Sequence, residues 1–172
     1  MTQTLEEILA GYEGLRADQE AFYQDLHRHP ELSHQEHDTA GRVAERLRGD
    51  GFTVQAGIGG TGVVGVLANG SGPTVLLRCE LDALPVREDT GAPYASTVTA
   101  HDAQGHEVPV AHACGHDLLV SASRGNFLTT PALPLQHCAK QLPFPAQSHM
   151  RGVSWQELWQ RSPSCHSLAG AC

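Results

Sequence analysis

A segment of six residues, His112-Ala113-Cys114-Gly115-His116-Asp117, constrains this chain more than any other feature. It places a thiol and an imidazole two residues apart, with a carboxylate directly after them. A soft sulfur and a borderline nitrogen are ligands that transition metals accept, and Gly115 allows the backbone to turn between them. We therefore expect a bent, extended segment in which Cys114 and His116 can face one metal ion.

The composition changes after this segment. Residues 1–117 contain 18 acidic residues against 7 arginines, whereas residues 118–172 contain one acidic residue, Glu157, against three arginines and one lysine. The second stretch also holds both tryptophans and three of the five cysteines, and it shows no clear amphipathic period. We expect a patterned part over residues 1–117 and a divergent tail over 118–172 that is poorly ordered or frame-shifted.

Charge and hydropathy exclude several classes of protein. The net charge of −8 argues against a nucleic-acid partner. No uncharged apolar run approaches the roughly 20 residues needed to cross a bilayer, and no secretory signal pattern opens the chain, so a cytoplasmic protein is expected. Five irregularly spaced cysteines do not predict a disulfide framework.

Local patterns predict an α/β chain. Apolar stripes predict one long or two short helices from Thr4 toward Pro30, and a further helix that starts at a capping box of Ser33 and Glu36 and ends at Gly49. Extended segments are expected at 52–54, 63–67 and 108–110, with the glycines at 59–60 breaking the first two apart. The most apolar run, residues 74–79, predicts a buried strand that ends at Glu80-Leu81-Asp82.

Several other histidines and aromatic residues have plain structural explanations. His27 and His29 lie near a predicted helix end, where an imidazole can cap carbonyl groups and interact favourably with the helix dipole. His101 and His106 are expected in an exposed polar hairpin. The aromatic residues at 12, 22 and 23 are expected to pack on helix faces.

Four motifs occur in order along residues 25–117 and together carry a family resemblance. The chain resembles the amidohydrolase branch of the aminoacylase and carboxypeptidase metallopeptidases, a group that includes hippurate hydrolases and indoleacetyl amino acid hydrolases. The resemblance covers the opening portion of that family's catalytic domain. It implies a truncated, partial three-layer α/β/α zinc-peptidase-like domain, with a mixed sheet and N-terminal helices. The motifs are Asp25 to Ser33 with Glu36 and Thr39-Ala40, Gly59 to Gly65, Arg78 to Val86, and His112 to Asp117.

The resemblance implies an enzyme, a metal-dependent amidohydrolase that cleaves the amide bond of small N-acyl amino acids. Two divalent metal ions, zinc or manganese, would lower the pKa of a bridging water that attacks the amide carbon. Cys114 and His116 match two metal ligands of the family. Asp82 matches its strand-end aspartate, which orients a ligand and tunes the bound water. Glu80 is not expected to bind metal, and the family pattern assigns no role to the side chain of Asp117.

The rest of the family pattern is missing after Asp117. The family has a pair of adjacent glutamates, two further histidine ligands and a lid domain, and none of these has a counterpart in residues 118–172. We therefore expect this chain to be inactive as it stands. Three alternatives stay open: a structural zinc site of Cys114 and His116 with His137 or Cys138, an interaction module around Trp155 and Trp159, and a chain that does not fold stably. The oligomeric state and the acyl and amino acid specificity are not indicated.

Overall fold

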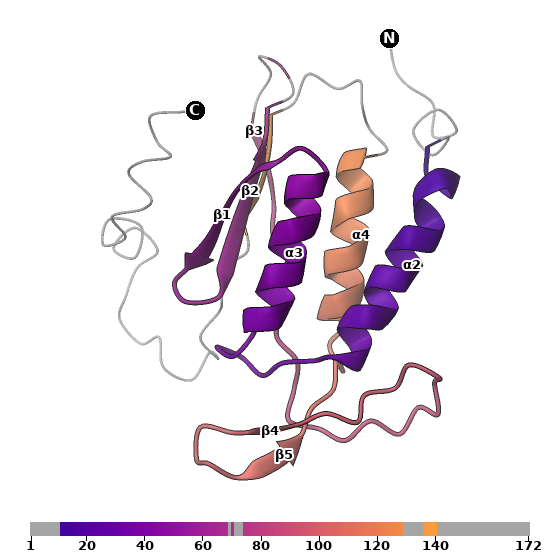
Figure 1. Cartoon of the computed structure of the whole chain (residues 1–172), viewed down its shortest axis with the longest axis vertical. Helices are drawn as coiled ribbons and strands as arrows, with labels where there is room; N and C mark the ends of the chain where they lie inside the picture. The colour runs from indigo at the N-terminus through magenta and orange to yellow at the C-terminus, as the bar shows by residue number, and fades with distance from the viewer. Residues whose placement is uncertain (1–10, 69, 71–73, 129–135, 141–172) are drawn as a thin grey trace.

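The computed structural model describes residues 11–68, 70, 74–128 and 136–140. Within these ranges the chain forms a mixed four-stranded sheet with helices on one face and a separate two-stranded hairpin beyond its end (Figure 1). The predicted α/β fold class is confirmed. The elements are α2 (Glu13–Arg28), α3 (His37–Gly49), β1 (Thr53–Ile58), β2 (Gly62–Leu67), β3 (Thr74–Leu77), β4 (Thr99–His101), β5 (Glu107–Pro109), α4 (His116–Leu128) and β6 (Gln136–Lys140).

Helix α2 follows the predicted apolar stripe. Phe22 and Leu26 are buried in the core, and the helix ends at Arg28. Pro30 explains this end, because proline disfavours the helical conformation of the residue before it. The part of the stripe that begins at Thr4 lies outside the described residues.

Helix α3 begins differently from the predicted capping box of Ser33 and Glu36. Glu36 is itself the N-cap and makes no capping hydrogen bond through its side chain; its buried carboxylate instead accepts a hydrogen bond of 2.8 Å from the Thr61 hydroxyl. The carboxylate of Glu31 accepts from the backbone N–H groups of Asp38 (3.1 Å) and Thr39 (2.7 Å). An anion at these unpaired N–H groups stabilises the helix start. The cap therefore comes from an acidic residue before the one that the pattern named.

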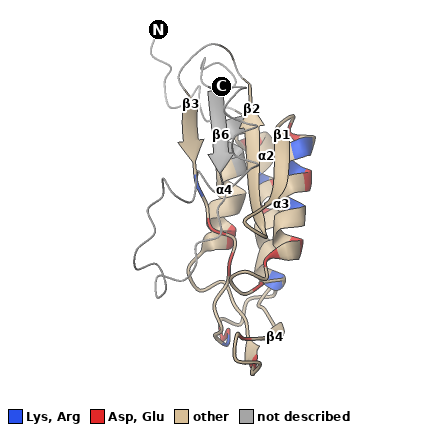
Figure 2. Cartoon of the chain, turned by 90° about the vertical axis from the view of Figure 1, so that its left-hand side faces the viewer, with Lys and Arg blue, Asp and Glu red and all other residues tan. Residues whose placement is uncertain are grey.

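The sheet combines a local hairpin with a long-range crossover. Strands β1 and β2 pair antiparallel, and the turn between them uses Gly59 and Gly60 at positive φ (64° and 112°), where glycine is unstrained. Strand β6 pairs antiparallel with β2 and parallel with β3, which gives the order β1-β2-β6-β3. In Figure 2 the sheet lies in front of the helices, so the described part forms two layers.

The prediction of a buried strand at residues 74–79 is wrong for its first half. Strand β3 is an edge strand whose described partner is β6 alone, and Val75 and Leu76 remain 40% and 58% exposed. The apolar composition of the run does not by itself decide whether neighbours cover it. Cys79 and Leu81, which follow the strand, are buried as expected.

The core lies between the helices and the sheet. Residues of all three helices, of β2 and of the segment after β3 form one cluster: Phe22, Leu26, Ala40, Val43, Ala44, Val63, Cys79, Leu81 and Val120. A smaller cluster of Leu32, Ala83 and Val110 joins the β4–β5 end to the base of the helices. The apolar face predicted for α3 is therefore confirmed.

The hairpin of β4 and β5 is exposed, as predicted, and His101 and His106 both lie on its surface. Helix α4 begins at His116 and continues past Asp117 to Leu128. The division of the chain at residue 117 stays a prediction. In the part of the chain that the structure describes, every helix is too short or too polar to cross a membrane.

Candidate functional site

Two of the predicted site residues, Asp82 and His116, lie in direct contact. Leu84 and Ala111 exchange backbone hydrogen bonds of 3.0 Å, which aligns the segment after β3 with the segment before α4. The Nδ1 atom of His116 then lies 2.8 Å from the Asp82 carbonyl oxygen and 3.0 Å from its Oδ1. On the other side of the ring, Nε2 lies 3.1 Å from Oε2 of Glu80. We call Glu80, Asp82, Cys114 and His116 the outer cluster.

Cys114 stands apart from this arrangement. Gly115 adopts φ +74°, which confirms the predicted turn between Cys114 and His116. The Cys114 thiol is free and exposed, and no hydrogen bond or ion pair is found between it and His116. Among the described residues, no three or more His, Cys, Asp or Glu side chains are arranged to hold a metal ion. The described part therefore does not make a complete metal site, and the assignment of Cys114 and His116 as ligands stays a prediction.

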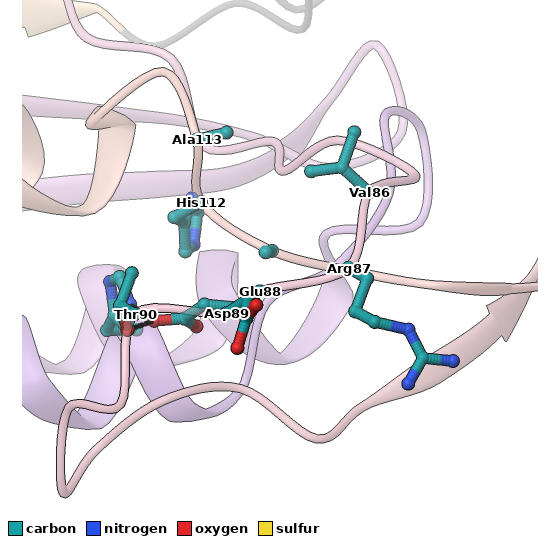
Figure 3. A pocket seen from close by; sticks show the side chains of 9 residues that line it. Val86, Arg87, Glu88, Asp89, Thr90, His112 and Ala113 are labelled. Carbon is teal, nitrogen blue, oxygen red and sulfur yellow. Dashed lines mark hydrogen bonds and ion pairs between the residues drawn. The ribbon is translucent and has the colours of Figure 1, made fainter.

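A small cavity of about 230 Å³ lies against the segment that precedes Cys114 (Figure 3). Its walls are the loop at 86–90 and the segment at 111–113, with His27 of α2. The ring of His112 is buried, with 7% exposure, and neither ring nitrogen has a hydrogen-bond partner in the described residues. Burial lowers the pKa of His112, since it disfavours the charged ring.

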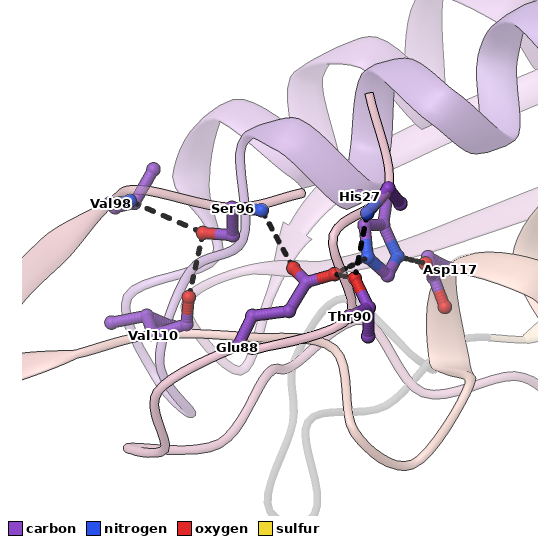
Figure 4. Close-up of polar contacts among 8 residues, drawn as sticks. His27, Glu88, Thr90, Ser96, Val98, Val110 and Asp117 are labelled. Carbon is purple, nitrogen blue, oxygen red and sulfur yellow. Dashed lines mark hydrogen bonds and ion pairs between the residues drawn. The ribbon is translucent and has the colours of Figure 1, made fainter. Parts of the chain in front are cut away.

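A second group of polar side chains lies deeper and is centred on His27 (Figure 4). The Nδ1 atom of His27 lies 2.6 Å from Oδ2 of Asp117, and its Nε2 lies 3.0 Å from Oε1 of Glu88. The three side chains are 12%, 2% and 5% exposed, respectively, which makes this a nearly buried charged group. We call His27, Glu88 and Asp117 the inner cluster. It joins the end of α2, the loop after β3 and the start of α4.

Two further hydrogen-bond donors contact the Glu88 carboxylate. The Thr90 hydroxyl donates to Oε1 at 2.5 Å, and the Ser96 backbone N–H donates to Oε2 at 2.6 Å. Burial opposes ionisation of Glu88, but the hydrogen bonds from Thr90, His27 and Ser96 outweigh it and lower the pKa to about 2. The carboxylate is therefore ionised at neutral pH.

The same contacts act on His27 in the opposite direction. Burial favours the neutral ring, yet the hydrogen bonds to Glu88 and Asp117 prevail and raise its pKa. Two tyrosines pack against the ring: the centroid of Tyr23 lies 5.6 Å away and that of Tyr94 5.3 Å away. Burial and a hydrogen bond with Tyr94 raise the pKa of Tyr23 to about 12. The two carboxylates thus favour the imidazolium form of His27.

The prediction that His27 caps a helix end is wrong, because both of its ring nitrogens face carboxylates. The same prediction is confirmed for His29, whose Nδ1 lies 2.8 Å from the carbonyl oxygen of Asp25 in the last turn of α2. The two histidines are two residues apart on a helix, so they point to different faces, and only His27 faces inward.

Sequence reasoning missed Glu88 and the role of Asp117. His27 and Asp117 both lie within motifs that carry the family resemblance, and this membership was the available signal for them. Glu88 lies just beyond the motif that ends at Val86 and is 61 residues from His27 in sequence, so no local pattern connects it to the histidine.

The comparisons with known proteins agree with this fold. No family model matches the chain. The sequence is 38% identical over 139 residues to a Synechocystis protein named as a probable hydrolase, a match that covers 76% of this chain and 32% of that protein. Since 76% exceeds the share held by the first 117 residues, this match includes residues after Asp117.

A second relative and a solved structure also indicate a hydrolase. Hippurate hydrolase of Campylobacter jejuni is 41% identical over 104 residues, which cover 60% of this chain and 25% of that enzyme. The crystal structure of the Bacillus subtilis YXEP protein, described as a dinuclear metal-binding peptidase of the M20 family, superposes with a TM-score of 0.64 and 27% identity. The superposition covers 76% of this chain and 36% of the YXEP chain.

The fold and the sequence matches together identify the class and the family of this chain. The described fold is that of part of a hydrolase catalytic domain. The chain is homologous to part of the amidohydrolase branch of the aminoacylase and carboxypeptidase metallopeptidases, which confirms the resemblance predicted from the motifs. It spans about a third or less of the length of the two curated relatives.

Proposed function

We propose that this chain carries part of the catalytic site of a metal-dependent amidohydrolase that cleaves the amide bond of small N-acyl amino acids. The homology to hippurate hydrolase and to a dinuclear metal-binding peptidase supports this proposal. In such a site, bound divalent metal ions, zinc or manganese, lower the pKa of a water molecule and so supply a nucleophile. The proposal assigns Cys114 and His116 as metal ligands and Asp82 as the residue that orients His116.

The contact between Asp82 and His116 is the observation that carries the proposal. Metal-binding histidines usually donate their second ring N–H to a carboxylate or a carbonyl oxygen, which fixes the tautomer and the ring orientation. Asp82 offers both kinds of acceptor to Nδ1 of His116, at 3.0 and 2.8 Å. This arrangement favours Nε2 as the atom of His116 that binds metal.

Glu80 faces Nε2 of His116 and forms an ion pair of 2.7 Å with Arg78. The arginine occupies one carboxylate oxygen, and the other lies beside the imidazole. Glu80 can therefore hold the ring in place in the absence of metal. We retain the prediction that Glu80 is not a metal ligand. Substitution of Glu80 distinguishes a metal ligand from a residue that only holds the His116 ring.

We further propose that the chain has no hydrolytic activity by itself. General-base catalysis contributes about 10²- to 10⁴-fold to rates of this kind. No pair of adjacent glutamates follows Asp117 in the sequence, and no group of three or more His, Cys, Asp or Glu side chains among the described residues is placed to hold a metal ion. Purified chain supplied with zinc or manganese should release no glycine from N-benzoylglycine above the rate without protein. Release of glycine would overturn this part of the proposal.

Cobalt binding tests the ligand assignment without requiring activity. A Co²⁺ ion bound by a thiolate gives a charge-transfer absorption band in the near ultraviolet. We expect Cys114→Ser and His116→Gln to abolish the band, and Asp82→Asn to weaken binding about 10- to 100-fold, in line with other residues that support a ligand. Glu80→Gln should leave binding within a few-fold. His106→Gln, on the exposed hairpin, is the matched control. An unchanged band in Cys114→Ser would contradict the assignment.

The location of the protein stays a proposal. Cys79 and Cys114 are free thiols. Free thiols accord with a reducing compartment such as the cytoplasm.

A further inference from the structure

The cavity lined by the 86–90 loop and the 111–113 segment has a polar group that the proposed metal site does not use. His112 is buried and lines the cavity, and both of its ring nitrogens are shielded from solvent. Figure 3 shows its ring pointing from the 111–113 segment toward the loop that carries Glu88 and Thr90. Buried polar groups in proteins nearly always have a hydrogen-bond partner. Neither nitrogen has one in the described part of the chain. Since both are shielded, a ligand in the cavity becomes a partner when the ring turns about its side-chain bonds and exposes one nitrogen.

The size and lining of the cavity limit what this ligand can be. A volume of about 230 Å³ is smaller than the 300–1,000 Å³ typical of sites for drug-sized molecules. Val86, Ala111 and Ala113 contribute apolar side chains to the wall. The cavity therefore suits one small chemical group with an apolar part and an oxygen or nitrogen that reaches His112.

The charges around the cavity favour a neutral group. Arg87 and Asp89 line the cavity with opposite charges. The inner cluster adds two carboxylates against one imidazole, so the charge beside the cavity is net negative even with the imidazole protonated, which disfavours an anion. A cation would find these carboxylates already engaged, because Glu88 accepts from Thr90, Ser96 and His27. A neutral carbonyl oxygen is not repelled by the negative charge and does not need a free carboxylate. It can accept a hydrogen bond from His112, because an imidazole carries at least one N–H donor in either protonation state.

We propose that this cavity binds the acyl group of an N-acyl amino acid, and that the His112 ring donates a hydrogen bond to the acyl carbonyl oxygen. The inference rests on the proposed function for the identity of the ligand. Ala113 lies in the wall and directly precedes Cys114, so an acyl group in the cavity lies next to the proposed ligand segment. His112 is then a residue that determines specificity.

Benzamide is the probe for the test, since it is a neutral acyl compound without an amino acid. The full-length chain is titrated in the presence of a chelator, and the ring signals of His112 are followed by nuclear magnetic resonance. We expect a saturable shift with benzamide and binding of benzoate at least tenfold weaker. His112→Ala should weaken binding about tenfold, the size expected for one hydrogen bond. Ala113→Leu, at an exposed position, should block binding by filling the cavity.

The controls separate this inference from the proposed metal site. His106→Ala, on the distant hairpin, should bind benzamide as the unmodified chain does. The inference would be overturned if both His112→Ala and Ala113→Leu bound benzamide as tightly as the unmodified chain does. It would also be overturned by the absence of a shift at millimolar benzamide, or by tighter binding of benzoate than of benzamide. Because the titration needs neither metal nor hydrolysis, loss of cobalt binding with intact benzamide binding would count against the proposed function alone.

Discussion

The inner and outer clusters share the segment at 112–117 but differ in how deeply their carboxylates are buried. His27 and His116 each have a carboxylate beside both ring nitrogens. Asp117 belongs to the inner cluster, in which every side chain is at most 12% exposed. Cys114 and His116 belong to the outer cluster, whose carboxylates are 26–36% exposed and whose thiol lies at the surface. One half of the motif is therefore packed into the fold, and the other half lies nearer the surface.

This difference explains why neighbouring residues of one motif can have unrelated roles. Gly115 reverses the local direction of the chain at φ +74°, so that the side chains before and after it diverge. His27 then fixes Asp117 at the start of α4 from the opposite side. The inner cluster thus holds the start of α4, where His116 also lies.

The largest expected effect comes from removing the imidazolium of the inner cluster. His27→Leu leaves Glu88 and Asp117 as nearly buried carboxylates without their shared cation, which should lower the free energy of unfolding by about 3–5 kcal/mol. Urea denaturation followed by circular dichroism measures this. His29→Leu is the control, because the side chain of His29 is 50% exposed, and it should change stability by less than about 0.5 kcal/mol. Equal losses in the two variants would remove the distinction between the clusters.

The pH dependence of stability gives the next largest effect. The pKa of His27 is raised, so its contribution is complete below its ordinary value of 6.5 and is lost as the pH rises through the folded-state pKa. The pKa of Glu88 is lowered from 4.5 to about 2, so its contribution is complete above pH 4.5 and is lost as the pH falls toward 2. The stability difference between the unmodified chain and His27→Gln should therefore be largest between pH 4.5 and 6.5. A difference that does not vary with pH would contradict the charged cluster.

A substitution at Gly115 probes the point where the two clusters separate. Nothing lies within 4 Å of where an added Cβ would be, so Gly115→Ala should act through the backbone alone. A left-handed conformation costs an alanine about 1–2 kcal/mol, and we expect this loss in the free energy of unfolding. Gly41→Ala in α3 also has free space, and it should stabilise the chain by about 0.5–1 kcal/mol. If both variants were stabilised, the turn at Gly115 would not exist as described.

The smallest effect on stability is expected at the exposed thiol. Cys114→Ser should change the free energy of unfolding by no more than about 0.5 kcal/mol, because the side chain is exposed. The thiol of Cys79 is buried, and burial raises its pKa, so it should react with iodoacetamide much more slowly than Cys114. Peptide mapping by mass spectrometry distinguishes the two. Faster labelling of Cys79 than of Cys114 would contradict the assignment of Cys79 as the buried thiol and Cys114 as the exposed one.

Local sequence patterns predicted the features whose causes are local. The apolar face of α3, the turn at Gly59 and Gly60 and the turn at Gly115 all follow from residue spacing or from the conformational freedom of glycine. The exposed hairpin around His101 and His106 follows in the same way. Motif order additionally predicted the class of fold.

The features that were missed depend on contacts between distant segments. The exposure of Val75 and Leu76 reflects the place of β3 at the edge of the sheet, which hydropathy does not encode. The partners of His27 lie 61 and 90 residues away, so its position near a helix end suggested only a cap. The predicted roles of His137, Cys138, Trp155 and Trp159 fall on side chains outside the described part and stay predictions.

The protonation state of His27 tests the central claim most directly, since the account requires an imidazolium held between two carboxylates. Nitrogen chemical shifts of the His27 ring, recorded by nuclear magnetic resonance from pH 5 to 9, give its pKa and its tautomer. We predict that the ring keeps both N–H protons well above pH 6.5, and that Asp117→Asn lowers its pKa. A His27 ring that titrates at or below 6.5, and that Asp117→Asn leaves unchanged, would contradict the account.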